Sequence, residues 1–117
     1  MDKQVKYATS IVRDMEESIA FYENVLGFTI DSRFAPAPGT MITLMKGKGE
    51  AMIELIKSDL YEVGFYSVGM EVEDLAATIA ELRAKGASVT DPAPTLVGKL
   101  AFTEDPNGVR ICLIQHD

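Results

Sequence analysis

Short runs of alternating apolar and polar residues predict strands along most of the chain, and two stretches carry the wider spacing of amphipathic helices. The first helix is predicted over about residues 15–26 and the second over about residues 75–85. Asp14 precedes the first helix, where its carboxylate can cap a free N–H, and Gly27 and Gly86 follow the helices as stops. The chain therefore combines helices with a larger number of strands.

The strands predicted from alternation are short and are separated by glycine and proline. Breakers lie at residues 35–39 (Ala-Pro-Ala-Pro-Gly) and 46–49 (Lys-Gly-Lys-Gly), and residues 105–108 (Asp-Pro-Asn-Gly) predict a tight turn. The predicted strands cover about residues 6–12, 28–33, 40–45, 51–56, 66–72, 87–89, 100–103 and 109–115. One strand thus precedes each helix, and three strands follow it.

The two halves of the chain repeat the same pattern. Residues 7–27 align with residues 67–86, and residues 53–56 align with residues 111–114. The aligned pairs are Val12 with Val72, Asp14 with Asp74, Met15 with Leu75, Ile19 with Ile79 and Tyr22 with Leu82. Each half reads as one βαβββ module.

A single βαβββ module of about 55 residues hides too little of its surface to be stable alone. We therefore expect one domain over residues 1–117, with module one at about 5–57, a linker at about 57–65 and module two at about 66–116. The two modules can pair within one chain or be exchanged between two chains. The sequence leaves that choice open.

Alternation along the strands divides their residues into an apolar set and a mixed set. The apolar set, expected beneath the helices, is Ala8, Ser10, Val12, Ile42, Leu44, Ile53, Leu55, Val68, Met70, Val72, Leu100, Phe102, Ile111 and Leu113. The mixed set is Tyr7, Thr9, Ile11, Met41, Thr43, Met45, Met52, Glu54, Ile56, Ser67, Gly69, Glu71, Lys99, Ala101, Thr103, Arg110, Cys112 and Ile114. The mixed set is either the solvated face of an antiparallel sheet or the lining of a pocket.

Charge and composition narrow the possible partners. The 117 residues include 18 acidic and 11 basic side chains, for a formal net charge of −7, so we expect no nucleic-acid partner and no anionic membrane partner. Cys112 is the one cysteine, which excludes an intramolecular disulfide and a cysteine-rich zinc site. No secretory signal or membrane-spanning apolar run is visible, so we expect a cytoplasmic protein.

Four short motifs resemble the vicinal oxygen chelate superfamily, which contains glyoxalase I, the bleomycin-resistance proteins, fosfomycin-resistance transferases and extradiol dioxygenases. The motifs are Ser18-x-x-Phe21-Tyr22-x-x-x-Leu26-Gly27, Ile53-Glu54-Leu55, Leu82-Arg83-Ala84-Lys85-Gly86 and Phe102-x-x-Asp105-Pro106-Asn107-Gly108. The resemblance covers about residues 5–115. It implies an α+β fold of two βαβββ modules that form an open, barrel-like cleft, and it implies a homodimer.

In metal-dependent members of that superfamily, the ligands lie on the first and last strands of each module. The corresponding positions here are Tyr7, Glu54, Ser67 and Cys112, of which Glu54 alone matches the usual ligand. Divalent transition metals favour imidazole or several anionic donors. We therefore expect no metal and no cofactor. The one histidine, His116, is interpreted as a solvated residue of the tail.

The candidate ligand-binding residues are Tyr7, Thr9, Met52, Glu54, Ser67, Arg110 and Cys112. Glu54 is the candidate for catalysis, because burial in a cleft would raise its pKa. The alternative is a structural ion pair with Arg110 or Lys99. Phe21 and Tyr22 are expected in the core. Met41, Met45 and Met52 are interpreted as an adaptable apolar wall or as ordinary packing residues.

Three functions are consistent with these residues. The preferred one is metal-independent binding of an apolar, aromatic or cationic small molecule in the cleft. The first alternative is a metal-dependent, glyoxalase-like lyase, isomerase or dioxygenase, which Glu54 supports directly. The second alternative is an accessory domain without a ligand. The superfamily hosts many chemistries, so the fold does not decide among them.

Overall fold

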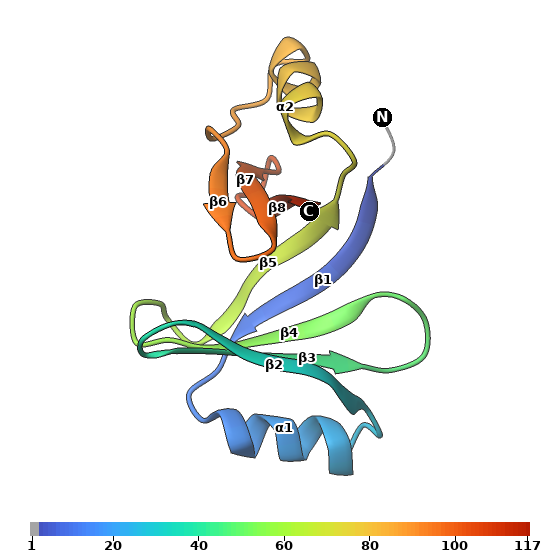
Figure 1. Ribbon diagram of the computed structural model, residues 1–117, viewed down its shortest axis with the longest axis vertical. Helices are drawn as coiled ribbons and strands as arrows, with labels where there is room; N and C mark the ends of the chain where they lie inside the picture. Colours follow the sequence, from blue (N-terminus) through green and yellow to red (C-terminus); the bar gives the residue numbers. More distant parts are fainter. Residues whose placement is uncertain (1–2) are drawn as a thin grey trace. The chain divides into compact units, whose positions relative to one another are not determined.

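The structure is a computed structural model that describes residues 3–117, and its elements follow the predicted order twice (Figure 1). The first βαβββ set is β1 (Gln4–Ile11), α1 (Met15–Asn24), β2 (Thr29–Ala37), β3 (Thr40–Lys46) and β4 (Met52–Lys57). The second set is β5 (Gly64–Glu71), α2 (Leu75–Ala84), β6 (Ala93–Thr95), β7 (Gly98–Glu104) and β8 (Arg110–His116). Neither described helix has the length and apolar character needed to cross a membrane. The described chain forms two compact units, residues 7–66 and residues 3–6 with 67–117.

In the unit of residues 7–66, the strands lie in the order β2-β3-β4-β1, and α1 covers one face (Figure 1). β1 runs parallel to β4, whereas β3 is antiparallel to both β2 and β4. Helix α1 begins where the carboxylate of Asp14 accepts the N–H of Glu17 at 3.0 Å, as predicted. Gly27 then adopts a φ of 76°, which ends the helix. The buried cluster under α1 consists of Met15, Ile19, Met45 and Leu55.

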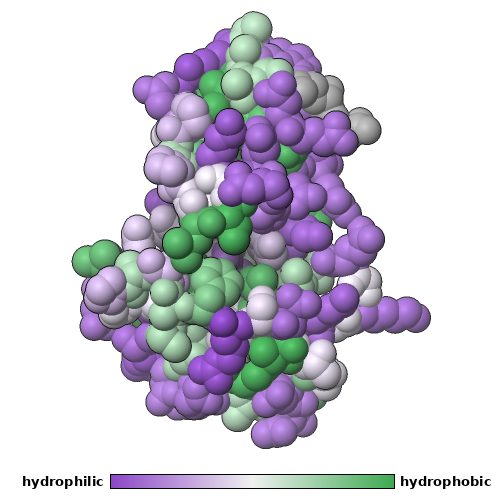
Figure 2. Space-filling model, in the orientation of Figure 1, coloured by the Kyte–Doolittle hydropathy of each residue, from purple (hydrophilic) through white to green (hydrophobic). Residues whose placement is uncertain are grey.

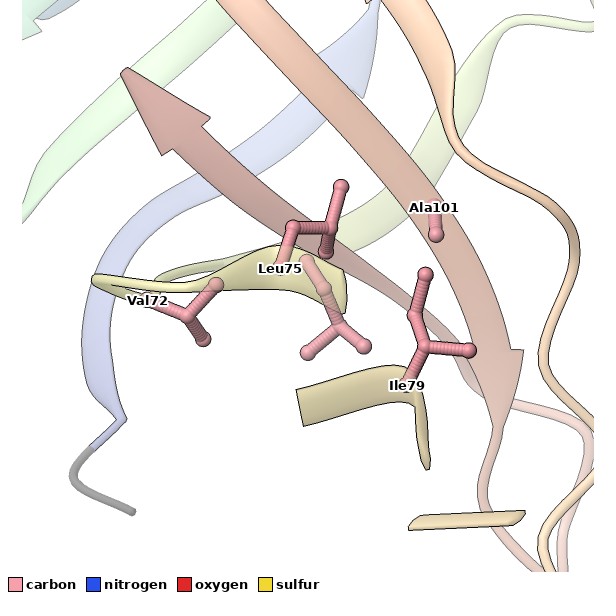
Figure 3. Close-up of a cluster of buried hydrophobic side chains, with 5 residues drawn as sticks. Val72, Leu75, Ile79 and Ala101 are labelled. Carbon is pink, nitrogen blue, oxygen red and sulfur yellow. The ribbon is translucent and has the colours of Figure 1, made fainter. Parts of the chain in front are cut away.

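In the unit that contains residues 67–117, the strands lie in the order β5-β8-β7-β6, and α2 covers one face. The side chains of Val72, Leu75, Ile79 and Ala101 gather in one buried cluster with Leu113 (Figure 3). The N–H of Leu75 donates to Oε1 of Gln115 at 2.7 Å, so β8 supplies a partner for the first turn of α2. The two units therefore have the same layered arrangement of one helix on one four-stranded sheet.

The orientation predicted for the side chains of β3 and β7 is wrong, because in both strands the residues predicted to face the helix lie on the other face of the sheet. Thr43 lies opposite Leu55 and Ala101 lies opposite Leu113, so these residues face the helices. Leu44 and Phe102, predicted under the helices, instead lie opposite residues of the mixed face. β3 carries large apolar residues in both phases of the alternation, so a shift of one residue reverses every side chain without changing the apparent hydrophobicity of either face. In β7, Leu100 and Phe102 form the more apolar phase, yet they lie opposite Ile114 and Cys112 and not on the helix side.

The predicted end of the second strand, at residue 33, is also wrong. β2 continues through the Ala-Pro-Ala segment to Ala37, with register shifts against β3 near Ile30 and between Phe34 and Ala37. β2 is the edge strand of its unit, where proline does not remove a ladder hydrogen bond. The chain turns only at Pro38 and Gly39. Pro36 therefore lies within an edge strand, and Pro38 lies in the turn that follows it.

The predicted strand at residues 87–89 is absent, and β6 forms later, at Ala93–Thr95. One backbone hydrogen bond and two side-chain hydrogen bonds attach the earlier segment to β7. The N–H of Thr90 donates to the carbonyl of Phe102 at 2.9 Å, and Oγ1 of Thr90 accepts the N–H of Phe102 at 2.8 Å. The hydroxyl of Thr103 donates to the carbonyl of Ser88 at 2.8 Å. Two hydroxyl hydrogen bonds and a single backbone bond thus hold this segment in place of the regular strand that alternation predicts.

Polar residues cover most of the face shown in Figure 2, and apolar patches interrupt them. The segment between β4 and β5, together with the start of β5, carries several of the large apolar residues that remain exposed. These are Leu60, Tyr61, Val63 and Phe65. The rings of Tyr61 and Tyr66 lie 5.1 Å apart in an edge-to-face arrangement, which gives this segment a local contact of its own.

Candidate functional site

A hydroxyl and a carboxylate meet on the mixed face of residues 7–66. Thr9 on β1 and Glu54 on β4 are register partners in the parallel pair, so their side chains share one face. The hydroxyl of Thr9 donates to Oε1 of Glu54 at 2.7 Å. Tyr7 and Met52 are the adjacent register partners two residues earlier. The structure thus brings together the four candidate site residues of this unit.

Glu54 is a partly buried carboxylate. It lies on β4, between β1 and β3, and its neighbour Leu44 on β3 is buried. Burial raises the pKa of Glu54 above the usual value, and the hydrogen bond from Thr9 offsets part of that increase. Within residues 7–66, no Lys or Arg side chain forms an ion pair with Glu54, and no second donor reaches its Oε2. Oε1 of Glu54 is therefore held by the hydrogen bond from Thr9, and Oε2 is available to a ligand.

The candidate residues of the other unit lie on β5 and β8. Cys112 is the register partner of Gly69 on β5 and of Phe102 on β7, and it is buried and in no disulfide. Ser67 is 3% exposed and precedes Gly69 by two residues, so it shares the face of Cys112. Arg110 and Phe102 both line a cavity of about 640 Å³. The guanidinium and the aromatic ring could hold the polar and apolar parts of a small molecule.

Tyr7 and Glu54 therefore share a face in one unit, and Ser67 and Cys112 share a face in the other. Our prediction that all four line one hollow stays a prediction. The same holds for the predicted ligand-binding roles of Thr9, Met52 and Arg110.

The sequence did not predict the contact between His116 and Glu71. β8 extends through His116, and Nδ1 of its ring lies 2.6 Å from Oε2 of Glu71 on β5. The two side chains border a cavity of about 400 Å³ together with Glu73 and Gln4. The interpretation of His116 as a solvated tail residue is therefore wrong. The repeat could not identify this pair, because the aligned segments end at residue 114.

The structure contradicts the expected burial of Phe21 and decides between the two interpretations of the methionines. Phe21 is 50% exposed, whereas Tyr22 packs against the cluster under α1 as predicted. Met45 is fully buried under α1 and Met41 is 40% exposed, so of the three predicted wall residues Met52 alone lies on the face of Glu54. The reversed phase of β3 explains why the methionine wall does not form.

The parallel β1–β4 pair, which carries Glu54, is repeated in the second unit as the parallel β5–β8 pair. The family model "Glyoxalase/Bleomycin resistance protein/Dioxygenase superfamily" matches residues 4–113. The chain therefore belongs to this superfamily, and the resemblance read from the motifs is confirmed.

Two relatives of this chain carry the name lactoylglutathione lyase, one of them as a probable one. A probable lactoylglutathione lyase of Synechocystis sp. is 34% identical, over 89% of this chain and 88% of that protein. The lactoylglutathione lyase of Haemophilus influenzae is 33% identical, over 97% of this chain and 93% of that protein. These relatives support the lyase alternative better than the metal-independent binding protein that the sequence first favoured.

Solved structures confirm the fold. A hypothetical protein from Bacillus halodurans has a TM-score of 0.86 at 18% identity and covers 100% of this chain and 96% of its own. The methylmalonyl-CoA epimerase from Mycobacterium tuberculosis has a TM-score of 0.82 at 20% identity, over 97% of this chain and 88% of its own. The predicted α+β class with two βαβββ modules is confirmed.

The expectation of no cofactor is corrected by the same comparison, because these relatives are metal-dependent enzymes. The side chains of this chain fit a metal poorly. Among residues 3–117, no three or more His, Cys, Asp or Glu side chains form a group that could hold a metal ion. Of the four family ligand positions, Glu54 alone carries a carboxylate or imidazole.

Proposed function

We propose that the protein is a glyoxalase-like enzyme, a lyase or isomerase, in which Glu54 moves a proton on a small substrate. The observation that carries the proposal is the partly buried carboxylate of Glu54, held through one oxygen by Thr9. A general base works best when its pKa lies near the working pH, and burial moves the pKa of Glu54 in that direction. The identity to lactoylglutathione lyases supports the same class.

The proposed substrate is the hemithioacetal of a 2-oxoaldehyde and a thiol. The name of the relatives indicates a lyase whose thioester, lactoylglutathione, separates into a thiol and a 2-oxoaldehyde. In the reverse direction, Oε2 of Glu54 accepts the proton from the carbon that bears sulfur, and the electron pair moves onto the neighbouring carbonyl oxygen to give an enediolate. The hydroxyl proton of the sulfur-bearing carbon passes to that oxygen, which leaves the negative charge on the other oxygen. Glu54 then returns its proton to the adjacent carbon as the charged oxygen becomes the thioester carbonyl, which yields the 2-hydroxy thioester. The step is an isomerisation, so no oxidant or reductant is consumed.

We infer the finer features of the protein from the same relationship. Its partner is a small molecule, its assembly is a homodimer and its location is the cytoplasm. Arg110 and Phe102, which line the cavity of about 640 Å³, are the residues of the second unit suited to bind the polar and apolar parts of a ligand.

The experiment is an assay of purified protein with the hemithioacetal that forms from methylglyoxal and glutathione, followed by thioester absorbance. It is run on protein as isolated, with its metal content measured, and again after addition of Ni²⁺ or Zn²⁺. We expect thioester formation, and we expect E54Q to lower kcat by about 10²-fold or more. C112S is the matched control at the equivalent position of the repeat. Equal activities of E54Q and wild type, or no thioester under any metal condition, would overturn the proposal.

A further inference from the structure

We propose that Thr9 is a positioning residue, which fixes the carboxylate of Glu54 in the orientation needed for proton transfer. The inference rests on the proposed role of Glu54. It goes further by assigning to the Thr9 hydroxyl the function of setting which carboxylate oxygen meets the substrate. The hydroxyl donates to Oε1 of Glu54 at 2.7 Å, so the second oxygen, Oε2, is left for the substrate.

Thr9 is itself held in place. It lies within β1, is 3% exposed and is the register partner of Glu54 in the parallel pair with β4. A β-branched side chain on a strand has few rotamers, so its hydroxyl is confined before any substrate binds. A hydroxyl has one hydrogen to donate, and here Oε1 of Glu54 accepts it. The strand pairing therefore sets the direction of this bond.

The repeat supplies an internal contrast. Gly69 and Cys112 are register partners on β5 and β8, as Thr9 and Glu54 are on β1 and β4. The second pair has a thiol in place of the carboxylate and no side chain in place of the hydroxyl. The unit with the acidic residue Glu54 thus has a hydroxyl donor beside it, and the unit without an acid at that position has no such donor. Strand structure alone does not require a threonine at this position.

A second buried threonine provides a matched control. Thr43, on β3 of the same unit, is 1% exposed, and its hydroxyl makes no hydrogen bond with the described residues. It faces α1, as its opposite neighbour Leu55 does, whereas Thr9 lies on the face of Glu54. T43V and T9V therefore remove the same group from equally buried strand positions. They differ in whether a carboxylate loses its donor.

The test compares T9V, T9S and T43V in the full chain, with the methylglyoxal–glutathione hemithioacetal as substrate. We expect T9V to lower kcat about tenfold, because a hydrogen bond to an ionised group is lost, and to leave KM nearly unchanged. T9S keeps the hydroxyl and should restore most of kcat. T43V should match wild type. A kcat of T9V equal to that of wild type, or a T9S variant as slow as T9V, would overturn the positioning role.

A measurement without substrate separates this inference from the proposed function. In protein with ¹³C-labelled glutamate, the carboxyl carbon of Glu54 is assigned with E54Q and observed at one alkaline pH. We expect T9V to shift this signal, and T9S and T43V to leave it near its wild-type position. If the signal responds in this way but no substrate is converted, the proposed function fails and the hydrogen bond stands. If E54Q abolishes turnover but T9V changes neither kcat nor the signal, the positioning role alone fails.

Discussion

The two units of this protein have the same scaffold and different chemistry. In both units, a parallel pair of strands lies beside a helix-covered core, and the first and last strands of the module are in equivalent register. One pair presents Thr9 and Glu54, and the other presents Gly69 and Cys112. The two units therefore place side chains at equivalent positions. The types of residue at those positions determine whether a unit can transfer a proton.

The cores of the two units repeat each other as closely as the strands do. Leu55 and Leu113 are buried at equivalent register positions, with exposures of 0% and 1%. Opposite them lie Thr43 and Ala101, which are equally buried. The difference between the units therefore lies in a few side chains and not in the packing plan.

The largest effect on stability is expected at the two core leucines. We expect L55A and L113A each to lower the free energy of unfolding by about 2–5 kcal/mol, because both leave a cavity under a helix. Urea denaturation followed by circular dichroism measures both. Similar losses would show that the two cores contribute equally. A loss in one variant and none in the other would contradict the equivalence of the two cores.

A smaller effect is expected from pH and is confined to the unit with Glu54. Its pKa is raised above the ordinary 4.5, so the folded state holds the proton more tightly than the unfolded state. This contribution to stability is full below that ordinary value and is lost as pH rises through the folded pKa. E54Q lacks it, so the Tm difference of E54Q from wild type should become more positive from acid to neutral pH. C112S should show no such trend. Thermal unfolding across the pH range measures both.

The smallest effect is expected at Thr43. Its counterpart Ala101 has no polar atom to leave without a partner, whereas the buried hydroxyl of Thr43 has none among the described residues. We expect T43V to raise the free energy of unfolding by about 1 kcal/mol, because a desolvated hydroxyl is removed. The midpoint of urea denaturation at a constant m-value measures this change. A destabilised T43V would indicate that the hydroxyl has a partner in solution.

Local signals in the sequence were sufficient for the order of the elements and for the repeat. The N-cap at Asp14 and the glycine stop at Gly27 are set by neighbouring residues, and both were predicted. The phases of β3 and β7 were not. Methionines on one face of β3 alternate with Ile42 and Leu44 on the other, and the more apolar phase of β7 does not face its helix. Their orientation is set by the strands and helix that they meet, which lie far away in the sequence.

The candidate site was predictable to the same extent. Alternation placed Thr9 and Glu54 on one face, and the structure agrees. The hydrogen bond between them depends on the register of two strands that alternation does not specify. His116 and Glu71 were missed for the same reason, since their contact joins the ends of β8 and β5. The sequence of one strand is enough to predict which of its residues share a face. Contacts between side chains of different strands also depend on which strands pair and in which register.

Thr9 and Glu54 are separated by 45 residues along the chain. Hairpins such as β2–β3 close over short loops, whereas this pair meets only when β1 and β4 come together in parallel across the helix and both intervening strands. During refolding, the oriented carboxylate therefore arises from a long-range closure, after secondary structure can already have formed. Recovered turnover would accordingly report assembly of the whole half-chain, and far-ultraviolet signals would return ahead of it.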